Sequence, residues 1–273
     1  MSADYVFHIR NANPEDMTAA LATLEAFPDL LTTAQVVESA AALGYAVQDK
    51  KRFEALMTAR DLGLVAPARY VLTDEGLALF RITKDKPSLF ADIMHGLHYI
   101  LWRKSHPANN CFSWSYRAIC QWLWHAGSAG ISNVRRTIAS EIESQACSAF
   151  MLPNVAVSPK TVGGAFLWFV QLQPSVIDPI HQEFRRRTFC PPELAILGVD
   201  FLYRDRETEY GTNLRLTDEN QEEICKVCLI DPHSFDRVLE YTLAQFDFLE
   251  KGTGGGWGRY LRLNRPPKLE DFI

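Results

Sequence analysis

The sequence predicts a mainly α-helical fold with small β-hairpins (α+β), in which two helices and a hairpin follow one another near each end of a helical middle. Apolar residues recur every three or four positions along most segments. Capping residues, Gly and Pro separate these segments. With 273 residues and 47% hydrophobic content, the chain is long enough to build several small cores.

The first segments read as two capped helices. Asn13 and Pro14 precede MTAALATLEAF, where Pro and acids suit a first helical turn. Thr32 or Thr33 then caps AQVVESAAALG, whose glycine provides the stop. We expect this second helix to be the first helix of a helix-turn-helix.

Residues 49 to 80 complete the predicted N-terminal motif. Asp49 is a candidate N-cap for a helix that buries Phe53, Leu56 and Met57. GLVAPARYVLT then places short strands around Pro67, and Thr73 caps DEGLALFRI. This order of helices and hairpin resembles the winged helix-turn-helix superfamily, whose middle helix can enter a DNA major groove.

The polar stretch TKDKPS (83 to 88) suggests a boundary before a helical middle region. LFADIMHGLHYILWRKSH and the aromatic FSWSYRAICQWLWHAG both read as helices. The latter is joined by SAGIS to NVRRTIASEIESQACSAF, which makes a second possible helix-turn-helix. LPNVAVS and GGAFLWFVQL are expected to be its strands, although prolines interrupt them.

The C-terminal region is predicted to repeat the helix–helix–hairpin order. After a helix starting at Pro191-Pro192, Thr217 caps TDENQEEICKVCLI, and Asp231-Pro232 opens PHSFDRVLEYTLAQFDFLEKG. GTGGGWGRYLRLN then forms a hairpin with a glycine-rich tip. We therefore expect an N-terminal winged helix (1–86), a helical middle domain (87–187) and a C-terminal winged-helix-like domain (188–273).

The net charge of −5 argues against a protein that coats nucleic acid, because neutralising phosphates needs many cations on one face. Local basic surfaces remain possible, and phosphate or base contacts would come from cations on the predicted helices and hairpins. The candidate nucleic-acid-binding residues are Lys50, Lys51, Arg52, Arg60, Arg69, Arg135, Arg136, Lys251, Arg259 and Arg262.

A plain solvated surface is the competing interpretation, since Asp49, Glu54 and Asp61 alternate with the first of these cations. Convergence of residues 50–69 and 251–262 on one concave face would favour DNA binding, and scattering would disfavour it. The triple arginine at 185–187 is the densest basic run and could instead pair with acids elsewhere.

Other motifs predict structure rather than chemistry. Cys225-x-x-Cys228 near His233 lacks the second ligand pair of a zinc site, and His95 and His98 lack a carboxylate partner, so we expect packing roles for all of them. The aromatic residues of 112–124 and 166–169 are expected in a core rather than stacked on bases. No catalytic signature, cofactor motif or metal site is predicted.

YVLTDEGLALF and the following PSLFADIMHGLHYILW resemble, in general layout, a family found beside DNA phosphorothioation and other phage-defence genes. The resemblance implies a role in bacterial antiviral defence and transfers no functional residue.

We therefore expect a non-enzymatic protein that binds duplex DNA, either as a transcription regulator or as a DNA-recognition subunit. The alternative is an adaptor whose winged helices dock a protein partner or a second copy, with the acidic-apolar tail PPKLEDFI as a further contact. The sequence has no apolar run of membrane-spanning length and no signal-peptide pattern, so a cytoplasmic location is expected.

Overall fold

The computed structural model describes residues 5–47, 53–178, 180–256 and 258–273. It confirms the predicted fold class, because helices dominate and the strands of the described residues form two small three-stranded antiparallel sheets. No helix within these residues is long and apolar enough to cross a membrane.

The N-terminal unit, defined here as α1 to α4, follows the predicted order. Its helices are α1 (Pro14–Ala26), α2 (Thr33–Ala42), α3 (Glu54–Asp61) and α4 (Asp74–Asp85). The side chains of Asn13, Thr32 and Thr73 cap α1, α2 and α4. The helix expected from Asp49 begins only at Glu54, after Phe53; Asp49 itself lies outside the described residues. A single antiparallel bridge between Val65 and Leu72 closes the hairpin.

The middle unit, defined as α6 to β3, differs from the prediction in its strands. It consists of α6 (Cys111–Ala126), β1 (Ser128–Gly130), α7 (Ile131–Ala149), α8 (Pro159–Phe169), β2 (Ile177–Asp178) and β3 (Glu183–Arg185). The prediction of a strand in GGAFLWFVQL is wrong, because Ser158 is the N-cap of a helix that begins at Pro159. LPNVAVS is not a strand either. The sheet order is β1-β3-β2.

The C-terminal unit, defined as α9 to β6, confirms the predicted helix–helix–hairpin and adds a strand. It contains α9 (Pro192–Asp205), β4 (Asn213–Arg215), α10 (Asp218–Cys228), the 3-10 turn η2 (Pro232–Ser234), α11 (Phe235–Gln245), β5 (Leu249–Gly254) and β6 (Gly258–Leu263). The sheet order β4-β6-β5 matches that of the middle unit. Both units thus run helix, strand, helix, helix, strand, strand.

The polar linker expected at 83–88 is largely helical. Thr83 to Asp85 form the end of α4, and the 3-10 turn η1 (Pro87–Leu89) leads directly into α5 (Phe90–Ile100). Nearly all of α5 is buried, because α6, α8 and α9 pack around it. Gly96 permits the closest approach, since a Cβ there would lie 2.7 Å from a methyl group of Leu197.

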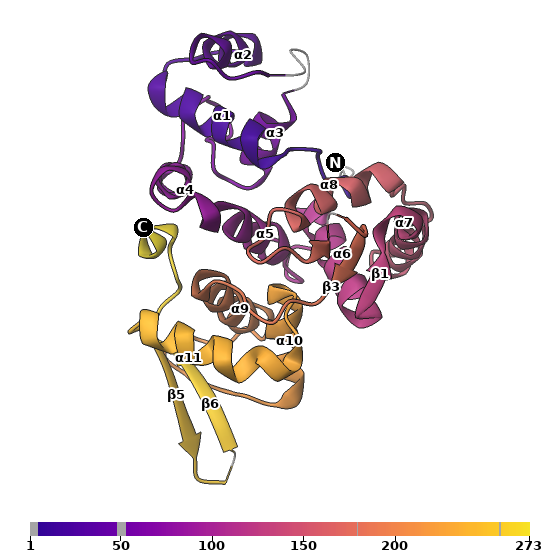
Figure 1. The fold of residues 1–273 in the computed structure, drawn as a ribbon, viewed down its shortest axis with the longest axis vertical. Helices are drawn as coiled ribbons and strands as arrows, with labels where there is room; N and C mark the ends of the chain where they lie inside the picture. The colour runs from indigo at the N-terminus through magenta and orange to yellow at the C-terminus, as the bar shows by residue number, and fades with distance from the viewer. Residues whose placement is uncertain (1–4, 48–52, 179, 257) are drawn as a thin grey trace.

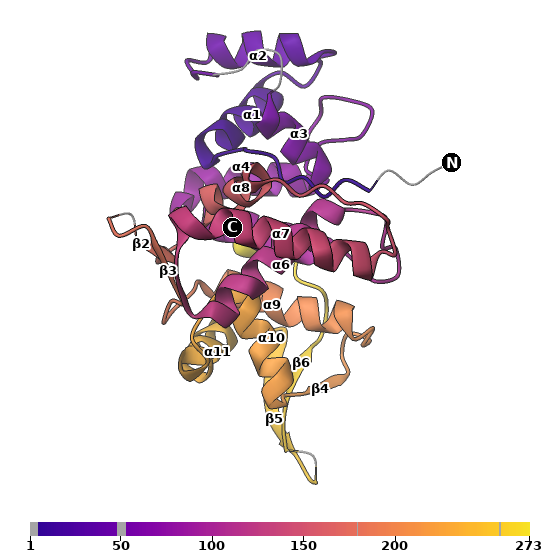
Figure 2. The ribbon, with the colours of Figure 1, turned by 90° about the vertical axis from the view of Figure 1, so that its right-hand side faces the viewer.

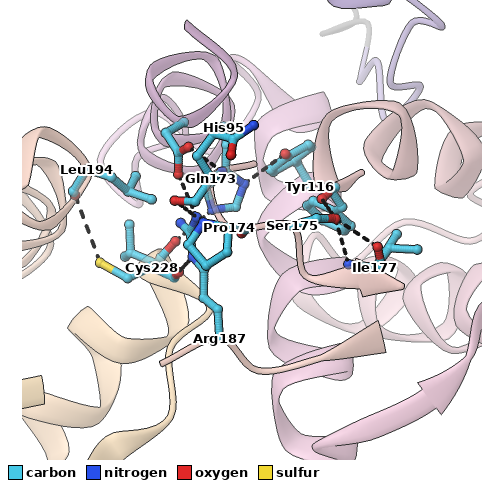
Figure 3. A network of polar contacts seen from close by, with 12 residues as sticks. His95, Tyr116, Gln173, Pro174, Ser175, Ile177, Arg187, Leu194 and Cys228 are labelled. Carbon is cyan, nitrogen blue, oxygen red and sulfur yellow. Dashed lines mark hydrogen bonds and ion pairs between the residues drawn. The ribbon is translucent and has the colours of Figure 1, made fainter. Parts of the chain in front are cut away.

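A buried polar network joins α5 to the middle unit and to the C-terminal unit (Figure 3). Arg187 forms an ion pair with Asp92 at 2.8 Å, and their side chains are 1% and 0% exposed. The Arg187 guanidinium also donates to the carbonyl of Cys228 in α10 and to that of Gln173, while the Gln173 amide donates to Asp92. Burial opposes the charge of Arg187, but the Asp92 carboxylate raises its pKa above the usual value.

His95 extends this network between α6 and α10. Its Nε2 lies 2.7 Å from the carbonyl of Val227 and its Nδ1 lies 2.9 Å from the hydroxyl of Tyr116. A neutral ring satisfies both contacts, with Nε2–H donating and Nδ1 accepting. Burial lowers the pKa of His95 to about 3 and that of His98 to about 4.

The N-terminal unit and the β5–β6 hairpin lie at opposite ends of the long axis (Figures 1 and 2). The C-terminal segment returns from the hairpin to the middle of the molecule and ends in the 3-10 turn η3 (Leu269–Phe272). Leu269 and Phe272 are buried there and η3 packs on α4. The tail expected to contact a partner therefore packs within its own chain.

Candidate nucleic-acid interface

Tyr70 organises the predicted interface of the N-terminal unit. Its hydroxyl lies 3.0 Å from the hydroxyl of Thr33 at the start of α2, and the Arg60 guanidinium of α3 lies 4.2 Å from the centre of its ring. The hairpin is held against α4 by the hydroxyl of Thr73, which donates to the Gly63 carbonyl. Two helices and the hairpin thus meet around one aromatic ring.

The acids of α3 are occupied by a cation that the sequence did not single out. Arg10, in the segment before α1, donates to the carboxylate of Asp61 at 2.7 Å and lies 3.9 Å from that of Glu54. Arg60 therefore has no acidic partner among the described residues and stacks on Tyr70 instead. The acids of α3 are therefore not neutralised by Arg60 of the same helix.

Arg69 lies in the hairpin turn and is exposed. Its side chain forms no hydrogen bond or ion pair with the described part of the chain, and only its backbone amide is used, donating to Ala66. Lys50, Lys51 and Arg52 lie outside the described residues, although in sequence they directly precede Phe53, the N-cap residue of α3.

The C-terminal unit uses its candidate cations differently. Three hairpin cations each form an ion pair with an acid: Lys251 with Glu240, Arg259 with Asp236, and Arg262 with Glu250. Two of these acids belong to α11, the helix that precedes the hairpin. Hydrogen bonds from Asn264 and Arg262 keep the pKa of Glu250 below its usual range, so this carboxylate is ionised at neutral pH.

The exposed side of α11 is partly apolar. Tyr241 is 53% exposed and packs edge-on against Phe189 at 6.1 Å between ring centres. With Pro192, Arg237, Ala244 and Gln245 these two rings line a shallow cavity of about 670 Å³. Arg237 donates to the carbonyl of Thr188. This face presents aromatic surface rather than unpaired cations.

In the middle unit, α8 is mostly buried and cannot lie in a groove. Gly164 faces the N-terminal segment so closely that a Cβ would lie 2.9 Å from the carbonyl oxygens of Ile9 and Arg10. Arg135 and Arg136 project from exposed positions of α7 instead. The Arg135 guanidinium lies 5.3 Å from the ring centre of Phe166.

The triple arginine is divided among three environments. Arg185 forms an ion pair with Glu183, Arg186 stacks on Trp124 and donates to its carbonyl, and Arg187 is the buried partner of Asp92. This dense basic run in the sequence is therefore not a basic surface patch.

The candidate cations do not converge. Those of α3 and the first hairpin lie at one end of the molecule, and those of β5 and β6 lie at the other (Figure 1). By the criterion set from the sequence, this scattering disfavours a single DNA-binding face that includes both sets.

Residues considered for other chemistry pack in the core. Cys225, Cys228, His95 and His98 are buried, and the described residues contain no group of three His, Cys, Asp or Glu side chains placed to hold a metal. The aromatic residues predicted as core are buried or packed against it.

Arg10, Tyr70 and Asp92 define the observed contacts, yet sequence patterns did not identify them as important. Arg10 and Asp92 act on partners 44 to 95 positions away, beyond the reach of helical periodicity. Tyr70 carried a usable signal, because an aromatic residue beside a hairpin Arg in a predicted winged helix is a natural stacking platform.

Comparisons with known proteins find no matching family model, no matching curated protein and no matching solved structure.

Proposed function

We propose that the chain is a DNA-binding protein of the winged helix-turn-helix type that contacts duplex DNA through its N-terminal unit. The observation that carries the proposal is that Arg60 and Arg69 have no acidic partner among the described residues while Arg10 occupies Glu54 and Asp61. A helix whose acids are paired with an arginine from another segment can present its remaining cations to phosphates.

The helix and the hairpin would divide the contacts. In a helix-turn-helix the N-terminal residues of the second helix approach base edges. Here that helix is α3, and Lys50 to Arg52 immediately precede it in sequence. Arg69 would reach a neighbouring phosphate from the hairpin turn. A DNA-reading role agrees with a regulator or recognition subunit in the bacterial cytoplasm, and with the defence association that the sequence resemblance implies.

A gel-shift titration with mixed-sequence duplex DNA at low salt tests this proposal. We expect the Arg60→Ala/Arg69→Ala protein to bind more weakly than wild type, with the slope of log K against log salt reduced by about 2, because each phosphate contact contributes about 0.9. Changing Lys50, Lys51 and Arg52 together to Glu should abolish binding.

The matched control is Arg259→Ala/Arg262→Ala, which removes the same charge from the ion-paired C-terminal hairpin. We expect this variant to retain wild-type affinity and salt slope. Absence of any wild-type shift at low salt, or equal losses in both double variants, would contradict the proposal.

A second candidate function, that of a protein-interaction adaptor, is favoured by the C-terminal unit. Tyr241 of α11 and Phe189, which precedes α9, form an aromatic surface, and the neighbouring cations Lys251 and Arg259 are already paired. Aromatic side chains are enriched at protein interfaces. If this face joins two copies of the chain, sedimentation should show a dimer that survives high salt and is lost in Tyr241→Asp; a monomer at all concentrations excludes this form of docking.

A further inference from the structure

A cavity of about 490 Å³ lies away from the proposed DNA contacts, where three parts of the chain meet. The loop after α5 forms one side, the end of α9 and the following loop form another, and Pro266 closes it. Its volume falls within the range of small-molecule sites. The lining residues come from α5 and the loop after it, from α9 and the loop after it, and from the C-terminal segment that leads to η3.

The cavity has rigid aromatic walls. Trp102 and Tyr210 both line it. The ring of Tyr210 stacks on Tyr203 with centres 5.4 Å apart and planes 4° apart. The Tyr203 hydroxyl donates to the Thr212 carbonyl and accepts from the Leu263 amide, which fixes the stack to the sheet. Planar ligands bind to walls of this kind by stacking.

The charges at the cavity leave one guanidinium available. Lys104 is paired with Asp205 at 3.0 Å, and Arg204 is paired with the fully buried Asp200 at 2.6 Å. The Tyr210 hydroxyl also donates to Asp200. Arg103 is exposed, and its side chain has no hydrogen bond or ion pair within the described residues.

The combination of walls and charges selects among ligand classes. A wholly apolar ligand would desolvate Arg103 and Lys104 without compensation. A polyanion is disfavoured, because the lining holds Arg103, Lys104 and Arg204 against Asp205 and Glu207, an excess of only one positive charge. A planar ring that carries a single phosphate satisfies both the aromatic walls and the free guanidinium.

We propose that this cavity binds a nucleoside monophosphate, with the base against Trp102 or Tyr210 and the phosphate on Arg103. A free mononucleotide and the 5′-phosphorylated end of a nucleic acid share this chemistry, and the proposal commits to the free mononucleotide. The site is independent of the proposed DNA contacts, since it shares no residue with them.

Isothermal titration calorimetry with the four nucleoside 5′-monophosphates tests the proposal on the full chain. We expect saturable binding of at least one of them. Arg103→Ala should weaken it about tenfold through loss of a charge-assisted hydrogen bond, and Trp102→Ala by a similar factor through loss of stacking. Trp102→Phe, which keeps a ring, should retain most of the affinity and guards against misfolding of the alanine variant.

The control is Phe27→Ala, an exposed aromatic residue outside the cavity, which should bind as wild type does. The proposal is overturned if no monophosphate binds at millimolar concentration, or if inorganic phosphate binds as tightly as the nucleotide. It is equally overturned if Arg103→Ala and Trp102→Ala leave the affinity unchanged, or if a 5′-phosphorylated oligonucleotide binds while every free monophosphate fails.

Discussion

The N-terminal and C-terminal units share the order helix, helix, hairpin, yet they pair their charges in opposite ways. In the N-terminal unit an arginine from outside the motif, Arg10, takes both acids of α3. In the C-terminal unit the hairpin cations themselves take the acids of α11 and β5. The same layout can therefore leave a face available to phosphates or neutralise it from within.

This difference shows that composition alone does not decide electrostatic function. Residues 35 to 80 contain 5 basic and 6 acidic side chains, and residues 217 to 273 contain 7 and 11, so neither segment is basic overall. What separates them is which acid each cation reaches. A pairing pattern of this kind is a property of tertiary structure, because its members come from different elements.

The largest expected effect on stability concerns the buried ion pair between Arg187 and Asp92, which links α5 to the segment before the C-terminal unit. Replacing Arg187 with Met should lower the free energy of unfolding by about 3–5 kcal/mol, because Asp92 would be left as an unpaired buried charge. Denaturant melts at neutral pH measure this loss. Arg185→Met, which removes an exposed arginine two positions away, should leave the melt unchanged; equal effects of the two substitutions would refute the role of the buried pair.

Acidification should loosen the same junction. Because burial lowers the folded pKa of His95 to about 3 and that of His98 to about 4, the unfolded chain binds protons first as the pH falls below about 6.5. The stabilisation from neutral histidines is thus complete above pH 6.5 and is lost towards the folded pKa values. Each should cost about 2 kcal/mol of unfolding free energy between pH 7 and pH 5.

Melts of His98→Leu measure one histidine's share of this dependence. The variant should change less between pH 7 and pH 5 than the wild type does. His233→Asn, which alters an exposed histidine, is the control and should keep the wild-type dependence. If His98→Leu and the wild type lose the same stability on acidification, His98 is not neutral in the folded protein.

Glycine positions test whether the two hairpins are built alike. A Cβ at Gly76 would lie 2.1 Å from the Leu64 carbonyl oxygen, because the N-terminal hairpin crosses the start of α4. Gly76→Ala should therefore destabilise the protein by about 2 kcal/mol as the backbone shifts to relieve the overlap. Gly255→Ala, in the C-terminal hairpin turn with open space around it, should change stability by less than about 0.5 kcal/mol. A neutral Gly76→Ala would contradict the tight crossing.

Local sequence signals predicted the helices well because their causes are local. Asn13, Thr73 and Thr217 cap helices as expected, and Gly127 ends α6. The prediction failed at 163–172, an apolar run of strand length with two glycines, most of which lies in α8. Such runs are ambiguous between strand and buried helix, and Ser158-Pro159 was the overlooked start signal. It also missed β4, whose three residues carry too little periodicity.

The candidate site was less predictable than the fold. Sequence reasoning placed Arg60 and Arg69 on a helix and a hairpin, but it could not assign Glu54 and Asp61 to Arg10, some fifty positions away. The same limitation applied to Arg187: the sequence allowed the triple arginine to pair with acids elsewhere, but it could not identify Asp92 as the partner of Arg187. Charge pairing between distant elements leaves no periodic trace in a single sequence.

The smallest expected effect is on DNA binding by the C-terminal hairpin. If only the ion pairs keep this hairpin from binding DNA, then replacing Asp236, Glu240 and Glu250 together with Ala should make Arg259, Lys251 and Arg262 available to phosphates. Low-salt affinity for duplex DNA should rise by about fivefold, with a steeper salt dependence.

This substitution also changes the net charge from −5 to −2, since three acids are removed. A control that removes three exposed acids elsewhere, Glu143, Glu209 and Glu270, makes the same change and should raise the affinity much less. Equal gains in DNA affinity in both triple variants would show that the effect comes from net charge alone. If affinity rises only when the paired acids are removed, the two ends of the molecule differ in the partners of their cations rather than in their architecture.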